Sequence, residues 1–217
     1  RIQPPVMHRA FTEYKHPAVH AEALDKAHSE LTPTQMRWDP LPHHEGKEEV
    51  DFVDGLATMS GAGDPAMKGG IAVHVYRCNT SMKDRCMTSA DGDFLIVPQE
   101  GELHIRTEMG LLDVAPKEIC VIQRGIRFTV DVDGPSRGYI CEVYGSHYKI
   151  PDLGPLGANG LANPRDFLHP VAAYEERTVE YEVIHKYGGS LWRAQMHHSP
   201  FDVVAWHGNY VPYKYHL

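Results

Sequence analysis

Residues 92–114 decide the fold, and they read GDFLIVPQEGELHIRTEMGLLDV. This stretch holds three strand-like runs, at Gly92–Pro98, Gly101–Thr107 and Leu111–Val114, and the turn between the last two is Glu108-Met109-Gly110. Along the second run, two sets of side chains alternate: Leu103, Ile105 and Thr107 against Glu102, His104 and Arg106. Because successive side chains of a strand point to opposite faces, the alternation predicts a hairpin with one buried and one solvated face.

The same pattern continues on both sides of this hairpin. From Val50 onward, short segments of β-branched, aromatic and aliphatic residues recur between turn signals, which is typical of a β-sandwich or barrel. Further strands are predicted at Glu118–Gln123, Arg127–Val132, Gly138–Tyr144, Thr178–Lys186, Leu191–Met196 and Val203–Trp206. Turns are expected at Gly61-Ala62-Gly63-Asp64 and Tyr187-Gly188-Gly189-Ser190, and a long ordered loop is expected at Pro151–Asp166, which is rich in glycine and proline.

The first 49 residues differ from the rest of the chain. They are rich in proline and histidine and end in the acidic stretch His43–Glu49. We therefore expect an extended N-terminal arm over residues 1–49, with a short helix at Ala18–Glu30, where small and charged residues cluster. Residues 50–217 are expected to form one domain, an all-β sandwich of the jelly-roll kind.

Composition limits the partners of the chain. Its 21 Lys and Arg residues against 29 Asp and Glu residues give a formal charge of −8. Since no block of Lys or Arg could follow a phosphate backbone, nucleic acid is not an expected partner. Nor is a membrane, because no apolar run approaches the roughly 20 residues that a helix needs to span a bilayer.

The four cysteines are Cys78, Cys86, Cys120 and Cys141, and none belongs to a C-x-x-C pair. Cys120 and Cys141 lie within strand-like runs. We expect free thiols packed in strands rather than disulfides, and free thiols suit a reducing cytosol. The sequence therefore predicts a cytoplasmic protein.

The strand order from Gly92 to Val132 resembles that of the cupins, many of which are metal enzymes. Metal-binding cupins place two His and one Glu on a first motif and a further His on a second, so that the ligands converge on one ion. Here the first motif falls at Cys78–Cys86, which contains no histidine. The second falls at Gln123–Phe128, where Phe128 stands at the expected ligand position. Since Phe cannot coordinate a metal, we predict a metal-free cupin-like sandwich.

The 15 histidines raise a metal hypothesis of their own. The spacing His-x5-Glu occurs at three places: His16/Glu22, His43/Glu49 and His169/Glu175. His197 and His198 are adjacent on a predicted strand, so their side chains would point to opposite faces. Because a ligand set needs convergence and not merely abundance, we favour surface or hydrogen-bonded histidines over a facial iron triad.

Other catalytic patterns are absent from the sequence. It has no G-x-S-x-G elbow, phosphate-binding loop or dinucleotide-binding fingerprint. The acid pairs Glu48/Glu49 and Glu175/Glu176 would alternate faces on a strand or be solvated in a loop. No catalytic residue and no metal ligand is assigned, and substrate-binding residues stay unknown.

Several longer stretches carry a more specific resemblance. They are Asn79–Met82, Asp91–Gln99, Glu118–Gly125, Gly138–Gly145, Pro151–Phe167 and Val203–Tyr215. In this order and spacing they closely resemble the homogentisate 1,2-dioxygenase family. The resemblance covers almost the whole chain, is dense from Val50 to Leu217, and is loose before that.

The resemblance implies a non-haem Fe(II) enzyme with an extradiol type of ring cleavage. Members use O2 to open the ring of homogentisate to maleylacetoacetate, a step of tyrosine and phenylalanine breakdown. In this family two jelly-roll domains form each chain, the chains assemble into trimers and hexamers, and the iron triad of two His and one Glu lies in the carboxy-terminal domain. No iron-site motif has a counterpart here, so we expect a fragment that is inactive alone and lacks residues on both sides of Arg1–Leu217.

Within such an enzyme, this segment is expected to act as scaffold and oligomerisation domain. The loop Pro151–Phe167, with Asn159, Asn163 and Arg165, could face a neighbouring subunit or the mouth of the active site; alternatively, these polar groups satisfy the loop's own backbone. The rival function is that of a metal-free cupin acting as a ligand-binding or structural module.

Overall fold

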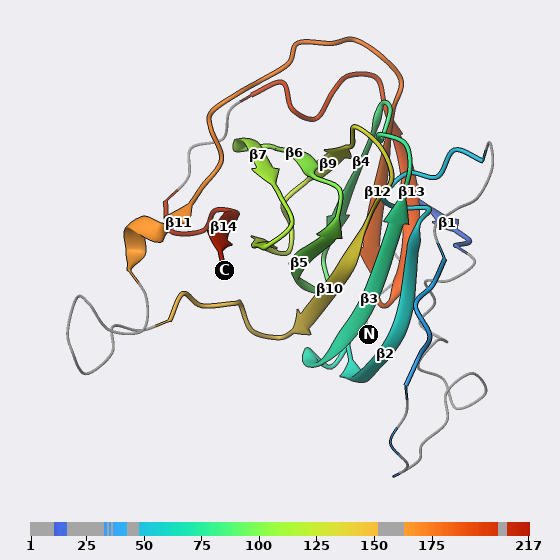
Figure 1. The fold of residues 1–217 in the computed structure, drawn as a ribbon. Helices are drawn as coiled ribbons and strands as arrows, with labels where there is room; N and C mark the ends of the chain where they lie inside the picture. Colours follow the sequence, from blue (N-terminus) through green and yellow to red (C-terminus); the bar gives the residue numbers. More distant parts are fainter. Residues whose placement is uncertain are drawn as a thin grey trace.

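The computed structural model describes residues 11–16, 33, 35, 37–42, 48–151, 163–203 and 208–217. These residues form two sheets of seven strands each, with a single 3-10 turn at Pro164–Asp166 and no α-helix in the described part. One sheet has the order β1-β13-β12-β4-β9-β6-β7, and the other has the order β11-β14-β8-β5-β10-β3-β2 (Figure 1). The predicted all-β sandwich is confirmed.

Eight strands make the jelly roll. They are β3 (Gly69–Cys78), β4 (Arg85–Ser89), β5 (Gly92–Glu100), β6 (Leu103–Thr107), β7 (Gly110–Val114), β8 (Glu118–Ile122), β9 (Phe128–Asp131) and β10 (Ser136–Tyr144). They pair as nested antiparallel partners, with β3 on β10, β4 on β9, β5 on β8 and β6 on β7. A long hairpin rolled up in this way puts alternate pairs in opposite sheets, which is the topology of a jelly roll.

The remaining strands extend the two sheets at their edges. They are β1 (Thr12–Tyr14), β2 (Leu56–Asp64), β11 (Phe167–Leu168), β12 (Tyr181–Tyr187), β13 (Ser190–Met196) and β14 (Tyr213–His216). β12 lies parallel to β4, whereas the other pairings among the described strands are antiparallel. The turn between β12 and β13 has Gly188 and Gly189 at φ of 64° and 79°, as a type I′ hairpin requires.

Two predictions about local structure are wrong. Gly61–Asp64 is not a turn but the end of β2, and the turn follows it at residues 65–68. Glycine is needed there because a Cβ on Gly63 would lie 2.1 Å from the carbonyl oxygen of Gly69 on β3. Val203 lies in a bend rather than a strand, since the Ser199 hydroxyl accepts from the Phe201 amide and turns the chain; residues 204–206 lie outside the described part.

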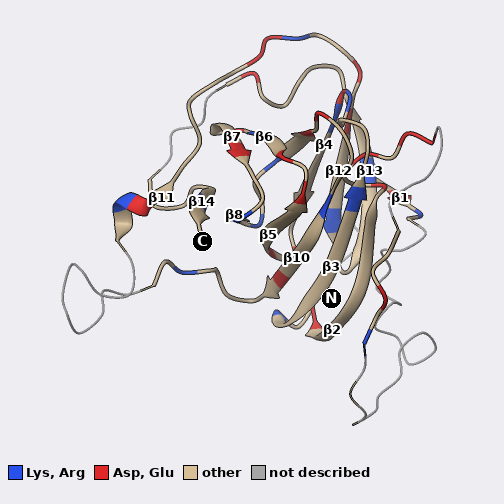
Figure 2. Ribbon diagram, in the orientation of Figure 1, with Lys and Arg blue, Asp and Glu red and all other residues tan. Residues whose placement is uncertain are grey.

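The described pieces of the N-terminal arm lie against the sandwich. β1 pairs with β13 at a sheet edge, and Arg77 Nη1 donates to the carbonyl oxygen of Pro42 at 2.6 Å. The helix predicted at Ala18–Glu30 lies outside the described residues. In Figure 2 the Lys and Arg residues of the described part are scattered among acidic and uncharged residues and form no long basic stripe.

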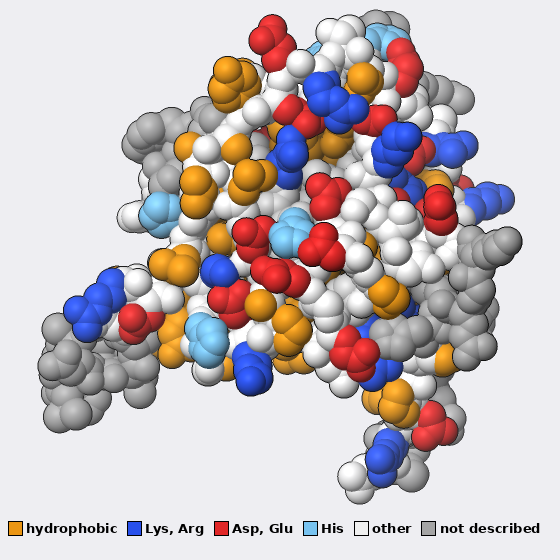
Figure 3. All heavy atoms as spheres, turned by 45° about the horizontal axis from the view of Figure 1, so that its top comes forward, with side chains coloured by type: hydrophobic (Ala, Val, Ile, Leu, Met, Phe, Trp, Pro, Cys, Tyr) orange, Lys and Arg blue, Asp and Glu red, His pale blue; other side chains and the backbone are white. Residues whose placement is uncertain are grey.

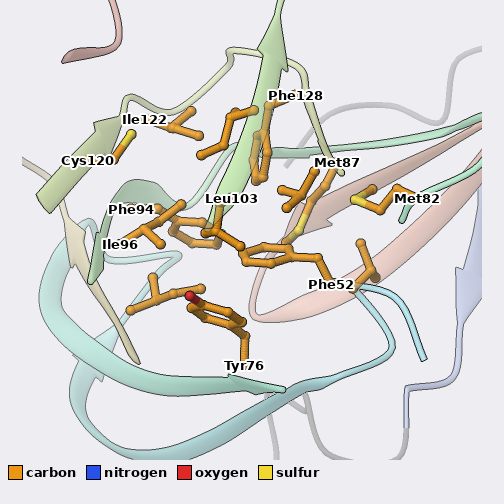
Figure 4. Packing of buried hydrophobic residues seen from close by; sticks show 14 of the residues in the cluster. Phe52, Tyr76, Met82, Met87, Phe94, Ile96, Leu103, Cys120, Ile122 and Phe128 are labelled. Carbon is orange, nitrogen blue, oxygen red and sulfur yellow. The ribbon is translucent and has the colours of Figure 1, made fainter. Parts of the chain in front are cut away.

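The core fills the space between the two sheets. Side chains of β6 follow the predicted alternation: Leu103, Ile105 and Thr107 are buried, while His104 and Arg106 are half-exposed. Phe52, Tyr76, Phe94 and Phe128 converge there with Met87 and Leu103 (Figure 4). None of the helices in the described part is long and apolar enough to cross a membrane.

Candidate functional site

The middle of the sandwich is apolar where the cupin resemblance would place a metal ligand. Phe128 is 1% exposed, and its ring meets those of Phe52 and Phe94 edge-on, with centroids 6.0 and 6.5 Å away. No group of three His, Cys, Asp or Glu residues in the described part could hold a metal ion. These residues do not fit iron, because hydrocarbon side chains offer it no ligand atom.

A buried ionic cluster lies beside this apolar layer, and we call it the Lys186 cluster: His74, Ser89, Asp91, Glu142 and Lys186. Lys186 Nζ lies 2.7 Å from Asp91 Oδ2 and 2.9 Å from Glu142 Oε2. His74 Nε2 and the Ser89 hydroxyl each lie 3.1 Å from Glu142. The cluster ties β3 and β10 of one sheet to β4 and β12 of the other.

The charged groups of the Lys186 cluster face one another. Burial alone would raise the pKa of Glu142, but the hydrogen bond from His74 and the charge of Lys186 outweigh burial and lower it. Asp91 also accepts from the amides of Gly188 and Gly189, at 2.7 and 2.9 Å. Each carboxylate therefore has its partners within the cluster, which is typical of a structural ion-pair network.

A second ionic cluster closes the other end of the interior, around Arg85. This side chain lies 2.8 Å from each of three carboxylates, those of Asp51, Asp54 and Glu182. Its guanidinium also lies over the ring of Tyr14, 5.1 Å from the centroid, and the Tyr14 hydroxyl donates to Asp54. Because Tyr14 belongs to β1, this cluster fastens the arm to the sandwich.

The cysteines are free, as expected, and all four lie in strands. Burial raises the pKa of the Cys78, Cys86 and Cys120 thiols to about 12. A thiol of that pKa is protonated at neutral pH and is neither a nucleophile nor a ready metal ligand.

Among the residues that the structure describes, the histidines singled out in the sequence do not converge. His197 and His198 lie in a bend beyond the end of β13, not on a strand, and they contact different carboxylates, Glu180 at 2.6 Å and Asp202 at 3.6 Å. In the pair His169/Glu175, the Glu175 carboxylate accepts hydrogen bonds from Arg106 Nη1 and from the Ser199 hydroxyl, both at 2.5 Å. Buried His16 bonds the carbonyl oxygen of Val53 at 2.8 Å, while Glu22 and His43 lie outside the described residues.

The described end of the loop Pro151–Phe167 uses its polar groups locally. The Asn163 side chain caps the 3-10 turn Pro164–Asp166 by accepting from the Arg165 amide at 3.3 Å. Asn159 lies outside the described residues. For Asn163, the structure supports the reading in which the side chain satisfies its own backbone.

A pocket beside this loop is the best candidate for a ligand site in the described part, and we call it the His147 pocket. Its volume is about 630 Å³, within the range of small-molecule sites. It lies between the segment after β10 and the segment that leads into β14. His147, Lys149, Phe167, Tyr210 and Tyr213 contribute to its lining.

His147 is held by a carboxylate behind it. Its Nδ1 lies 3.1 Å from both oxygens of Asp93, whose side chain is 0% exposed. Asp93 also accepts from the amides of Arg124 and Tyr148, at 2.9 and 3.1 Å. An Asp–His pair of this kind fixes the orientation and tautomer of the imidazole.

Neither member of the pair was singled out from the sequence. Asp93 stands 54 residues from His147, and nothing local links them. The sequence held one signal, which is that Asp93 directly precedes the apolar run Phe94–Val97. An Asp at the start of a buried strand needs hydrogen-bond partners.

Comparison with known proteins agrees with the resemblance found in the sequence. A family model described as the N-terminal part of homogentisate 1,2-dioxygenase matches residues 1–217. The chain belongs to the homogentisate 1,2-dioxygenase family. The homogentisate 1,2-dioxygenase of Dictyostelium discoideum is 54% identical over 218 residues, and that of Homo sapiens is 54% identical over 220. Each match covers 100% of this chain and 49% of the relative, so the chain spans about half the length of these homogentisate 1,2-dioxygenases.

Solved structures give weaker likenesses. A cupin-2 domain protein of Shewanella frigidimarina aligns with a TM-score of 0.31 and 18% identity, over 34% of this chain and 70% of its own. The Escherichia coli pirin YhhW, in complex with nickel(II), aligns with a TM-score of 0.32 and 12% identity, over 75% and 86%. The jelly-roll assignment rests on the strand order described above.

Proposed function

We propose that this chain is the scaffold half of a homogentisate 1,2-dioxygenase. The complete enzyme opens the aromatic ring of homogentisate with O2 to give maleylacetoacetate, as a step of tyrosine and phenylalanine breakdown. The observation that carries this proposal is the identity of 54% to dioxygenases along the whole chain. The free thiols support a cytoplasmic location.

The iron of the enzyme lies outside this chain under the proposal. The described residues do not fit a metal, since Phe128 and its aromatic neighbours fill the middle of the sandwich. The carboxylates and imidazole of the Lys186 cluster are engaged with one another. We therefore derive no chemical step on these residues, and we place the extradiol-type ring cleavage in the other half.

Packing surfaces support the scaffold role. Apolar residues of the outer face of one sheet, among them Val73, Val75 and Tyr139, line a groove of about 590 Å³ together with Trp38 of the arm. Ile71 and Tyr139 are 43% and 46% exposed on β3 and β10. Such a face suits burial against the iron-binding half or a neighbouring subunit of a trimer or hexamer. On the face shown in Figure 3, by contrast, acidic side chains gather around a histidine.

The test uses the full-length protein. With Fe(II) and homogentisate, an oxygen electrode should record one O2 consumed for each homogentisate, and maleylacetoacetate should form. A purified, folded and iron-loaded protein that consumes no O2 with homogentisate would contradict the proposal. Size-exclusion chromatography with light scattering on the same sample should show a trimer or hexamer.

A second function, that of a ligand-binding cupin, is favoured by the His147 pocket. Its Asp–His pair and aromatic lining are not needed by a purely structural module. The two functions are compatible, because a scaffold can also bind a small molecule.

A further inference from the structure

A second pocket lies on the outer face of the sheet that contains β6 and β9, and we call it the Asp131 pocket. Its volume is about 340 Å³, at the small end of the range for small-molecule sites. Its walls come from residues 80–84, from β6 and β9, and from the connection that leads into β12. It shares no described lining residue with the His147 pocket.

The charged side chains in the lining of the Asp131 pocket balance. Arg106 lies 2.5 Å from Glu175, and Arg177 lies 2.5 Å from Asp84. Two further charged residues line the pocket, one of each sign, so that the described lining holds three basic and three acidic side chains: Lys83, Arg106, Arg177, Asp84, Asp131 and Glu175. A lining of this composition favours a ligand without net charge.

Asp131 is left without a partner in this set. Within the described part of the chain, its carboxylate makes no ion pair and no side-chain hydrogen bond. The residue is half-buried, and burial raises its pKa, which the charges of Arg106 and His104 only partly offset. A cationic group bound beside Asp131 would therefore be stabilising. A metal ion does not fit, because no three acidic, His or Cys side chains of the described residues converge on one point.

Lys83 lies beside the strand that carries Asp131. The Met82 amide donates to the carbonyl oxygen of Val130 at 3.0 Å, so the chain that leads to Lys83 runs along β9. Lys83 is exposed and lines the pocket, and it has no ion pair within the described residues. An unpaired cation and an unpaired carboxylate thus lie within one small volume.

The Tyr181 hydroxyl is a third group without a partner. The residue is 2% exposed, and its ring meets that of Phe201 edge-on, with centroids 6.2 Å apart. It lines the pocket, yet its hydroxyl makes no hydrogen bond to any residue that the structure describes. Because a hydroxyl on a buried side chain normally has a partner, we expect an acceptor on the ligand.

We propose that the Asp131 pocket binds a small α-amino acid in its zwitterionic form. The ammonium of the ligand pairs with Asp131, and its carboxylate pairs with Lys83 and accepts a hydrogen bond from the Tyr181 hydroxyl. The inference goes beyond the proposed function, because this binding needs neither iron nor homogentisate. A protein that failed as a dioxygenase could still bind an amino acid here.

The test is an NMR titration of the purified chain with L-leucine, whose apolar side chain can contact Met82. A well-dispersed spectrum of the free chain shows beforehand that it is folded. For a ligand of this size we expect a Kd on the order of 1 mM. Isoamylamine, which lacks the carboxylate, and isocaproate, which lacks the ammonium, should each bind about tenfold more weakly, a typical loss for one charged contact in a pocket.

The variants assign each contact. Asp131→Asn keeps the shape of the side chain but removes its charge, so L-leucine and isocaproate should bind this variant equally. Lys83→Met should reduce the preference for L-leucine over isoamylamine to about threefold, the part supplied by Tyr181, and adding Tyr181→Phe should abolish it. The matched controls are Glu102→Gln and Lys149→Met, which remove exposed charges elsewhere.

Loss of each preference in its own variant, with both controls unchanged, supports the proposal. No saturable binding by about 20 mM, roughly twentyfold above the expected Kd, overturns it. So does a preference for the zwitterion that persists in the variants. Asp131→Asn removes an unpaired charge, so its urea midpoint should equal or exceed that of the natural chain; a lower midpoint would reveal a structural role and would also overturn the proposal. If Tyr181→Phe fails to fold, Lys83→Met alone decides, since an exposed lysine can be replaced without unfolding.

Discussion

The apolar layer around Phe128 and the Lys186 cluster occupy the same interior but fill it by different means. Phe128 packs among aromatic rings, and its position is stabilised by the exclusion of water and by close packing. Lys186, Glu142 and His74 are just as buried, with exposures of 2%, 0% and 3%, yet they are held by charge and hydrogen bonds. The rings of Phe52, Phe94 and Phe128 have no metal-ligating atoms, and in the Lys186 cluster such atoms are bound to one another. Two different fillings therefore lead to the same expectation, a scaffold without iron.

The two regions should also fail differently. A substitution that leaves a cavity in the apolar layer lowers the free energy of unfolding, because buried apolar surface and packing contacts are lost. This loss hardly depends on pH. Removal of one charge from the cluster leaves others buried without compensation, and that cost depends on which groups are ionised.

The largest effect is expected from Phe128→Ala. Deleting a buried ring that contacts Phe52 and Phe94 should lower the free energy of unfolding by about 3–5 kcal/mol. Urea denaturation of the purified chain measures it. Tyr174→Ala, which alters a ring that is 67% exposed, is the control and should change stability by less than about 0.5 kcal/mol. A loss below about 1 kcal/mol for Phe128→Ala would show that the layer is not packed as described.

Next comes Lys186→Met, which keeps most of the volume of the side chain but removes its charge. Asp91 and Glu142 would then both lose the ammonium group that faces them in the interior, and the free energy of unfolding should fall by about 3 kcal/mol. The same urea experiment tests this, with Lys83→Met as the exposed control. An unchanged midpoint would mean that the ion pairs of Lys186 contribute nothing.

The pH dependence separates the two regions most clearly. The folded pKa of Glu142 lies below its unfolded value of 4.5, so its contribution is present above about pH 4.5 and is lost as the pH falls through the folded pKa. Each unit by which the pKa is lowered corresponds to about 1.4 kcal/mol. Glu142→Gln should flatten the acid limb of stability against pH, whereas Phe128→Ala should shift the whole curve down in parallel. An acid limb equally steep in both variants would contradict the assignment.

The smallest effect is expected at His104 on the surface, where the pH dependence of stability runs in the opposite direction to that of Glu142. The hydrogen bond to Asp113 raises the pKa of His104, with a further contribution from Asp133. The resulting stability is present below about pH 6.5 and is lost as the pH rises through the folded pKa. Because these side chains are solvated, His104→Gln should cost no more than a few tenths of a kcal/mol at pH 6 and nothing at pH 9. NMR titration of His104 checks the direction.

The sequence predicted the apolar region far better than the charged one. Alternation along residues 101–107 correctly assigned Leu103 and Ile105 to the inside, because a strand's period of two is a local property. The Lys186 cluster was missed because Glu142 lies 68 residues from His74 and 44 from Lys186, and only the rolled topology brings them together. The family resemblance was predicted from the quoted stretches alone, and the family model that matches residues 1–217 confirms it.

Strand boundaries show the same division between local and distant causes. The hairpin at Gly188-Gly189 was predicted because glycines with positive φ are a local requirement of the turn. β14 was missed because Tyr213–His216 becomes a strand by pairing with β8, nearly a hundred residues earlier.

Iron content of the purified chain tests the central claim most directly. The chain would be incubated anaerobically with Fe(II), desalted, assayed for iron by mass spectrometry, and then supplied with homogentisate and O2. Our account predicts far less than one iron per chain and no homogentisate-dependent uptake of O2. One tightly bound iron per chain, together with O2 uptake that Phe128→Ala or Glu142→Gln abolishes, would contradict it.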